Sequence, residues 1–455
     1  MERWLAAALD YIPEWIDFQM CLTEQPGVSI AVSHDGKPVL ECALGHADAV
    51  AGTALTPRHR FRVASHSKSF TAAGIMKLRE QGKLQLDDPA GRHVKRLHPA
   101  VARVTIAQLL SHSAGIIRDG TDSGQWQDRR PFLRPHELRA ALREAPSIEA
   151  NTRFKYSNHG FGLAGLVIEA VTGEPYGQWI KRAIVEPAGL RETEPDMPDG
   201  ARFPMASGHS AKLPLGRRVI IPGRNSTHAL AAATGFVSTA RDLTRFFALL
   251  DPATKRSILS VESRREMIRR QWRDPHASLE TYYGLGIMSS TIGKWDRFGH
   301  SGGFQGFITR TAALLRQGIV VSVLTNAVDG LAHPWLDGVV QIIQAFARHG
   351  APSTGVRDWR GRWWNLWGAV DLVPMGRTVM VARPAFVNPF MDASEVSVSG
   401  PDRGRIVIAN GYGNHGEAFR RVRSRDGKVE EVWLGGTRFV PEGEVAKELD
   451  SRYGG

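Results

Sequence analysis

The sequence predicts an α+β fold, in which an antiparallel sheet flanked by helices carries an inserted helical subdomain and is followed by a small C-terminal all-β domain. Strand-like runs of apolar residues occur in two distant segments, residues 27–45 and 299–326. The segment between them, from about residue 83 to 200, follows mainly helical patterns. The simplest arrangement is one sheet built from both outer segments, with the helical middle beside it.

Turn residues mark the expected strands of this sheet. In residues 27–45, two alternating runs flank the pair Asp35-Gly36, which is typical of a tight β-hairpin. Residues 307–315 and 318–324 are a second pair of apolar runs, separated by a short polar turn. Both ends of the region therefore contribute hairpins to the sheet.

Helices are expected where apolar residues recur with helical spacing and a glycine follows. A helical run within residues 61–81 ends at Gly82, and residues 160–171 end at Gly173. A further helix over residues 335–347 closes the region.

A change of composition near residue 350 predicts a domain boundary. Residues 350–356 form a candidate linker, which leaves residues 1–349 and 357–455 as the expected domains. The second domain contains short strand-like runs between turn signals, which favour a barrel: residues 378–382, 395–398, 405–408, 418–422 and 429–434. Its clustered tryptophans are interpreted as core residues of that barrel rather than as a ligand site: Trp359, Trp363, Trp364 and Trp367.

Composition limits the class of protein. The chain has 455 residues, of which 42% are hydrophobic and 23% charged, as expected for a soluble protein of two or three domains. Asp10 and Glu14 interrupt the apolar residues of the N-terminal segment. We therefore interpret it as an amphipathic helix rather than a signal peptide, and expect a cytoplasmic location.

Charge and cysteine content argue against several partners. The two cysteines give neither a disulfide framework nor a metal-binding spacing, and we expect no metal and no cofactor. The net charge of +12 comes from scattered arginines without a recognisable nucleic-acid-binding module. Neither nucleic acid nor membrane is therefore expected as a partner, whereas a preference for anionic substrates stays open.

The segment Ser65-His66-Ser67-Lys68 stands at the head of an apolar helical run. A serine and a lysine three residues apart lie on one face of a helix, where the amine can take the proton of the hydroxyl. A lysine acts as a base only if its pKa is lowered, and burial in an apolar helix has that effect. Taken alone, the pair is a weak signal, since a capping serine and a solvated lysine give the same pattern.

Two further motifs follow in a meaningful order. Tyr156 could relay a proton and Asn158 could hold the lysine and a substrate carbonyl, while the segment 300–303 precedes a predicted strand. A backbone N–H from that segment, paired with the N–H of Ser65, would make an oxyanion hole. Singly, these residues are better explained as a packing tyrosine, a helix cap and a turn histidine. The order of all three motifs indicates a serine acyl-transfer site.

With these motifs, the chain resembles the serine β-lactamase and penicillin-binding protein superfamily over roughly residues 25–347. It resembles most closely the branch of class C β-lactamases, DD-carboxypeptidases, D-aminopeptidases and esterases. The stretches 108–115, 234–243 and 283–286 also resemble the scaffold of that family. The resemblance implies a β-lactamase/transpeptidase-like fold, and the C-terminal domain resembles the lipocalin-like appendage of some peptidases in the group.

The resemblance also implies a role for each motif residue. Ser65 would be the acylated nucleophile, Lys68 its general base and Tyr156 the group that protonates the leaving group. His300 would be a further catalytic residue, at the third-motif position. The remaining positions would orient Lys68 and bind the substrate, with the N–H groups of Ser65 and Gly303 as the oxyanion hole: Asn158, Ser301, Gly302 and Gly303.

One departure from the family bears on substrate choice. The third motif is His300-Ser301-Gly302, where class C β-lactamases carry Lys-Thr-Gly, so a titratable imidazole replaces a permanent cation. This argues against a β-lactamase and favours the peptidase and esterase members of the family, several of which also resemble this chain in having His at that position. Among these, we expect a peptidase or amidase acting on small molecules or short peptides, including peptides with D-residues. A carboxylesterase or β-lactamase-like enzyme, a non-catalytic penicillin-recognising protein and a basic surface-binding protein are the alternatives, and the oligomeric state is open.

Overall fold

The computed structural model describes residues 1–197, 203–275, 278, 280–409 and 413–454. These residues divide into two compact units, one of Gln25–Leu336 and one of Met1–Glu24 together with Asp337–Gly455. The boundaries expected from the sequence, with a linker at 350–356, stay a prediction. No described helix is both long and apolar enough to cross a membrane.

An antiparallel sheet organises the unit Gln25–Leu336, in the strand order β3-β2-β1-β13-β12-β11-β10-β9-β8. The two segments that the sequence singled out meet at its centre, where β1 pairs antiparallel with β13 from Val28 opposite Thr325 to His34 opposite Ile319. This confirms the antiparallel sheet. The strands are β1 (Gly27–His34), β2 (Lys37–Asp48), β3 (Thr53–Ala54), β8 (Trp272–Asp274), β9 (Thr281–Tyr283), β10 (Met288–Ile292), β11 (Trp295–Phe304), β12 (Phe307–Leu314) and β13 (Ile319–Thr325).

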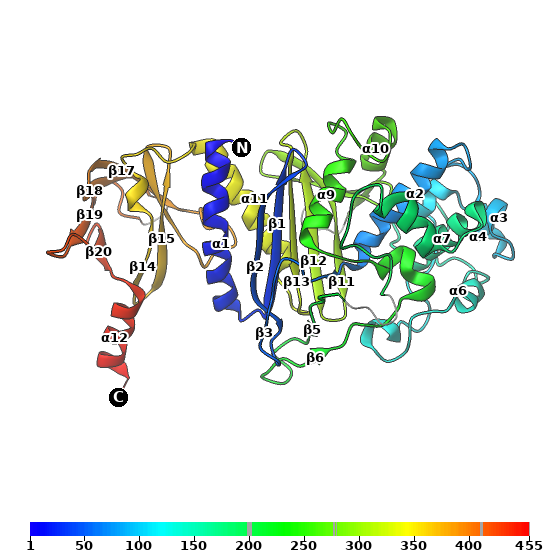
Figure 1. The fold of residues 1–455 in the computed structure, drawn as a ribbon, viewed down its shortest axis with the longest axis horizontal. Helices are drawn as coiled ribbons and strands as arrows, with labels where there is room; N and C mark the ends of the chain where they lie inside the picture. The colour runs from blue at the N-terminus through cyan, green and yellow to red at the C-terminus, as the bar shows by residue number, and fades with distance from the viewer. Residues whose placement is uncertain (198–202, 276–277, 279, 410–412, 455) are drawn as a thin grey trace. The chain divides into compact units, whose positions relative to one another are not determined.

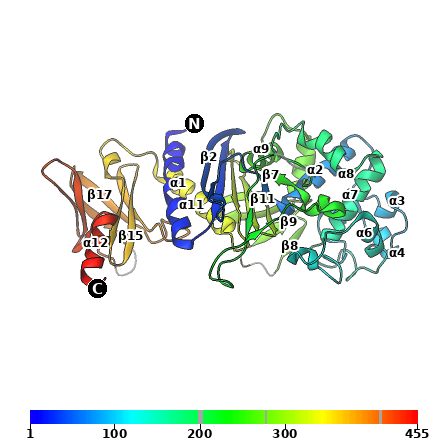
Figure 2. The ribbon, with the colours of Figure 1, turned by 60° about the horizontal axis from the view of Figure 1, so that its bottom comes forward.

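Helices cover this sheet and form the expected helical subdomain. The amphipathic helix α9 (Ala240–Leu250) packs on β1, β12 and β13 (Figure 1). Helices α2 (Ser67–Glu80), α7 (Asn158–Thr172) and α8 (Tyr176–Ile180) pack on one another (Figure 2). Shorter helices complete the unit: α3 (Ala90–His93), α4 (Pro99–Arg103), α5 (Ile106–Leu110), α6 (Pro135–Ala141) and α10 (Val261–Ile268).

Aromatic stacking anchors α2 in the core. The Phe70 ring lies between Phe236 and Phe246, with ring centroids 4.3 and 3.8 Å away. The short strands β4 (Phe61–Arg62) and β7 (Val237–Ser238) pair just before α2 and α9, and β5 (Gly208–His209) pairs with β6 (Ile220–Ile221) elsewhere in the unit. Helix α2, which bears Lys68 directly after Ser65, is therefore held by aromatic packing and by its neighbouring helices.

The second unit contains an eight-stranded antiparallel sheet among its described residues, in sequence order from β14 to β21. Hydrogen bonds between Trp364 and Val440 join its ends, so the sheet is a nearly closed barrel. The strands are β14 (Gly361–Asn365), β15 (Gly368–Met375), β16 (Thr378–Ala382), β17 (Ser394–Gly400), β18 (Arg403–Ile408), β19 (Ala418–Arg423), β20 (Val429–Leu434) and β21 (Thr437–Phe439). The expected C-terminal all-β barrel is confirmed, and its lipocalin-like identity stays a prediction.

The tryptophans of this unit do not all serve its core. Trp359 is buried in the barrel, with its ring stacked 5.0 Å from Phe419, whereas Trp363 is only partly buried. Trp367 is 91% exposed because it lies in the tight β14–β15 turn. The interpretation of the cluster as core residues is therefore correct for Trp359 and wrong for Trp367.

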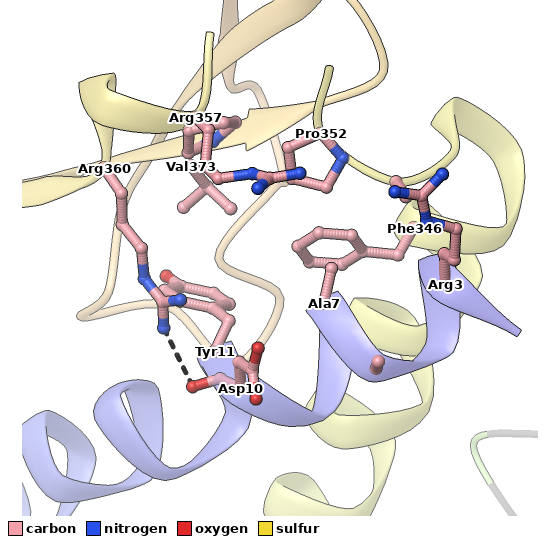
Figure 3. Close-up of a pocket in the computed structure, with 12 residues that line it drawn as sticks. Arg3, Ala7, Asp10, Tyr11, Phe346, Pro352, Arg357, Arg360 and Val373 are labelled. Carbon is pink, nitrogen blue, oxygen red and sulfur yellow. Dashed lines mark hydrogen bonds between the residues drawn. The ribbon is translucent and has the colours of Figure 1, made fainter. Parts of the chain in front are cut away.

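Helix α1 (Arg3–Thr23) belongs to the same unit as the barrel, together with the end of α11 (Ala332–His349) and the short helix α12 (Glu442–Tyr453). Tyr11 donates a hydrogen bond to Asp371 Oδ2 at 2.8 Å. Trp15 packs directly on Gly338: a Cβ added at Gly338 would lie 2.3 Å from the Trp15 ring. A cavity of about 390 Å³ lies beside α1, with Arg3, Arg357 and Arg360 around it (Figure 3).

The buried Trp15 side chain is expected to account for much of the stability of this unit. Trp15→Ala should lower the free energy of unfolding by about 3–5 kcal/mol, because it leaves a large cavity in a packed contact. Trp367→Ala, the matched exposed tryptophan, should change it by less than about 0.5 kcal/mol. Urea denaturation followed by circular dichroism measures both, and equal effects of the two substitutions would contradict this packing.

Candidate active site

A tight backbone turn presents Ser65. The residue before it, Ala64, has φ of +48°, a left-handed conformation that is unfavourable for a residue with a Cβ. Ser67 stabilises this turn, because its Oγ donates to the Ala64 carbonyl at 2.5 Å and accepts from the Phe236 N–H at 3.0 Å. Ser65 lies in the short helix Ala64–His66, immediately before α2.

Lys68, in the first turn of α2, is completely buried. Its Nζ lies 3.0 Å from Ser65 Oγ, 2.7 Å from Asn158 Oδ1 and 2.8 Å from the Ala233 carbonyl oxygen. Burial away from water disfavours the charged form and lowers the pKa of Lys68 well below its usual value. The surroundings of Lys68 therefore favour the uncharged amine over the ammonium form.

Tyr156 reaches the same hydroxyl from the other side. Its Oη donates a hydrogen bond to Ser65 Oγ at 2.7 Å, and burial raises the pKa of the phenol above its usual value. The ring stacks on His112 at 4.1 Å and lies under Lys68 Nζ at 4.7 Å from the ring centroid. The phenol is thus protonated and fixed in place at neutral pH.

Asn158 is the first residue of α7 and does not cap it. The cap is Ser157, whose Oγ accepts from the Gly160 N–H at 2.8 Å. The Asn158 side chain is free to point inward, where Oδ1 meets Lys68 and Nδ2 donates to Asp119 Oδ1 at 2.7 Å. The alternative of Asn158 as a helix cap is therefore wrong.

The third motif precedes the expected strand, which is β12, and itself lies inside a further strand, β11. Its glycines make an isolated strand unfavourable, but pairing with β10 and β12 overrides that preference. Gly302 is required for the contact with the Ser65 segment, because a Cβ there would lie 2.2 Å from the Val63 carbonyl oxygen. At Gly303 a Cβ would meet only Ile308, at 3.6 Å.

His300 is buried and uncharged at neutral pH. Its Nε2 lies 2.8 Å from Tyr283 Oη and its Nδ1 lies 2.7 Å from the Ser301 carbonyl oxygen. Burial, followed by the nearby His66 and Lys68, lowers the pKa of His300 well below its usual value. The third motif therefore offers the pocket a neutral imidazole.

The motifs meet at one cavity of about 520 Å³. Lys68 lies outside its lining, beneath Ser65. Seven residues singled out from the sequence line it: Ser65, Tyr156, Asn158, His300, Ser301, Gly302 and Gly303. Apolar side chains, among them Trp126, Phe154 and Met288, form much of the remaining wall. Its other charged or titratable members are Arg118, Asp274, Tyr283 and His333. No group of residues in the described parts of the chain is arranged to hold a metal ion.

Sequence reasoning missed the residues that support the motif positions. His112 backs Tyr156, Tyr283 bonds His300, and Asp119 bonds Asn158. His66, inside the first motif, is a buried structural residue with pKa lowered to about 3, hydrogen-bonded between Val63 and Thr311. Two of them had a signal, because His112 and Tyr283 fall in the stretches 108–115 and 283–286 that resemble the family scaffold.

The close approach of β11 to the Ser65 segment gives a test. Gly302→Ala should lower the melting temperature by several degrees, because its Cβ collides with the Val63 carbonyl and forces β11 outward. Gly303→Ala should shift it much less, because only Ile308 lies near that Cβ. Differential scanning fluorimetry of the two variants compares them directly, and similar melting temperatures would contradict the contact.

Comparison with known proteins identifies the family to which this chain belongs. A family model described as Beta-lactamase matches residues 19–337. "Protein flp" of Staphylococcus aureus (strain MW2) is 30% identical over 172 residues, 37% of this chain and 34% of that protein. The chain therefore spans only about a third of the length of that relative. Esterase EstB of Burkholderia gladioli is 25% identical over 384 residues, 72% of this chain and 93% of the esterase.

Solved structures agree with this match. A penicillin-binding protein homologue from Pyrococcus abyssi, octameric in its structure, has a TM-score of 0.66 and 24% identity over 95% of this chain and 99% of its own. A D-stereospecific amidohydrolase from Streptomyces sp. has a TM-score of 0.57 and 26% identity over 71% of this chain and 94% of its own. The chain belongs to the β-lactamase and penicillin-binding protein superfamily, in the class C-like branch that includes amidohydrolases and esterases.

Proposed function

We propose that this protein is a serine hydrolase that cleaves an amide or ester bond through an acyl-enzyme on Ser65. The observation that carries the proposal is that Ser65 Oγ lies within hydrogen-bond distance of both Lys68 Nζ and Tyr156 Oη, at 3.0 and 2.7 Å. A serine hydroxyl needs a base to remove its proton and a donor to supply the leaving group, and both are adjacent to it.

The contacts of Lys68 fit an uncharged amine. A neutral amine has two N–H donors and one lone pair, and Asn158 Oδ1 and the Ala233 carbonyl are acceptors for the two donors. The lone pair then faces Ser65 Oγ, whose hydrogen points to the amine. Tyr156 donates its own hydrogen to the same oxygen. Every hydrogen in this network has one acceptor, and the serine proton already points at the base.

The proposed reaction proceeds in two halves. Lys68 takes the proton of Ser65 as Oγ attacks the substrate carbonyl carbon, and the N–H groups of Ser65 and Gly303 bind the resulting oxyanion. The carbonyl–heteroatom bond breaks as Tyr156 passes its proton to the leaving amine or alkoxide, and Lys68 returns a proton to Tyr156. Water then attacks the acyl-enzyme with the same groups in reversed roles, which releases the acid and restores Ser65.

Small amides, including those of D-amino acids, are the proposed first choice of substrate, with small esters as the second candidate. The neutral His300 gives no fixed cation for the carboxylate of a β-lactam, which argues against a β-lactamase. The cavity of about 520 Å³ is of small-molecule size. Similarity to the D-stereospecific amidohydrolase supports the amide, and similarity to EstB supports the ester. A non-catalytic penicillin-recognising role is less well supported, because every reacting group is present.

Intact mass after exposure to a fluorophosphonate tests the nucleophile. The wild-type protein should gain one adduct that maps to Ser65, and Ser65→Ala should gain none, because Ser65 is the serine that contacts the buried amine among the residues that the structure describes. Ser69→Ala is the matched control, since Ser69 lies on the same helix but bonds the Gly286 carbonyl. It should label like wild type. Absence of any wild-type adduct would favour the binding-protein alternative.

Matched substrates test Tyr156 as the proton donor. Tyr156→Phe should slow hydrolysis of D-phenylalanine amide by about 10²-fold or more, and of D-phenylalanine methyl ester much less, because an amine leaves poorly unless protonated. Tyr176→Phe is the control, since this buried tyrosine bonds Thr71 outside the cavity and should leave the amide-to-ester ratio unchanged. If Tyr156→Phe slowed hydrolysis of the amide and of the ester equally, Tyr156 would not be the proton donor to the leaving group.

A further inference from the structure

The Asn158 amide connects Lys68 to a buried carboxylate. Its Oδ1 meets Lys68 Nζ at 2.7 Å, and its Nδ2 donates to Asp119 Oδ1 at 2.7 Å. An amide can present either end to a neighbour, but a carboxylate only accepts hydrogen bonds. Asp119 therefore forces the NH₂ end of Asn158 toward itself and leaves the oxygen to face Lys68.

Arg118 completes the arrangement from the side of solvent. Its side chain is 66% exposed, yet its Nε lies 3.1 Å from Asp119 Oδ2 and its guanidinium lies 5.4 Å from the centre of the Tyr156 ring. Its backbone carbonyl accepts from the N–H groups of Asn158 and His159, at 3.0 and 3.2 Å, which fixes the segment against the start of α7. One cation and one anion thus flank the two groups that contact Ser65.

We propose that Asp119 and Arg118 are positioning residues of this active site, which orient the Asn158 amide and balance the charge around Lys68. The proposal rests on the proposed function, since it assigns Lys68 as the base. With the Asn158 oxygen held toward Lys68, one N–H of the amine is occupied and the lone pair stays directed at Ser65. If Asn158 turned around, its NH₂ would compete for that lone pair.

The two residues act on Lys68 with opposite sign. The Asp119 carboxylate raises the pKa of Lys68 and the Arg118 guanidinium lowers it, both against the larger lowering caused by burial. The other titratable groups that face Lys68 are His112, His300 and Tyr156. Burial lowers the pKa of both histidines and raises that of the phenol, so all three are uncharged at neutral pH. The formal charges near Lys68 are therefore those of this pair.

The pH dependence of fluorophosphonate labelling at Ser65 tests the proposal without a known substrate. Labelling needs neutral Lys68, so its rate should rise with pH through the pKa of that amine. Asp119→Asn keeps an acceptor for Asn158 but removes the charge that raises the pKa of Lys68. The part of the pH profile over which labelling rises, its acidic limb, should therefore move about one pH unit lower. Arg118→Gln should move it to higher pH. Asp122→Asn, a 68% exposed neighbour paired with Arg130, should leave it in place.

A second variant separates orientation from charge. Asp119→Ala removes the acceptor as well, and the plateau labelling rate should fall by about 10-fold or more because the Asn158 amide is no longer held. The proposal would be overturned if the acidic limb of the labelling profile stayed in place in Asp119→Asn and Arg118→Gln, or if it moved in the same direction in both variants. Because Arg118 is exposed, its variant gives this answer even if Asp119 variants fold poorly. Absence of labelling in the wild type would instead overturn the proposed function.

Discussion

The removal of Lys68 from water is the constraint on which the proposed active site depends. To act as the proposed base, an amine on α2 has to lose its charge, so the protein must exclude solvent and supply fixed partners for two hydrogens and one lone pair. The surrounding structure satisfies this requirement through α7, which brings Asn158, and through the segment that ends in the Ala233 carbonyl. The left-handed turn at Ala64, stabilised by Ser67, then points Ser65 at the remaining face of the amine.

Most of the fold could be predicted from local signals. Two alternating runs around Asp35-Gly36 identified the hairpin at 27–45, and a second pair of apolar runs identified the strands after residue 307. Their placement at the two ends of a helical region predicted one shared sheet. The grouping of α1 with the barrel was not predictable, because no sequence pattern within α1 shows that this helix packs on residues beyond 337. The exposure of Trp367 was missed because composition shows clustering of tryptophans but not which of them occupies a turn.

The residues of the candidate site could be named from the sequence, whereas their environment could not. Ser65, Lys68, Tyr156 and His300 stand in recognisable motifs, and all four come to one place. The charge of His300 depends on burial between β10 and β12 and on the nearby His66 and Lys68, which no spacing in the sequence records. Asp119 bonds a residue 39 positions away, and nothing in its own segment distinguishes it from the exposed Asp122.

The grouping of α1 with the C-terminal barrel has a consequence for biosynthesis. Tyr11 finds its partner Asp371 only 360 residues later, so the apolar face of this helix leaves the ribosome long before its own unit exists. At ordinary elongation rates the interval is roughly 20–70 s. The unit Gln25–Leu336 can fold during that time, while the apolar face of α1 still lacks its packing partners from the C-terminal part of the chain. Chaperone binding to this helix during translation, and aggregation of chains cut short before the barrel, follow from this order of synthesis.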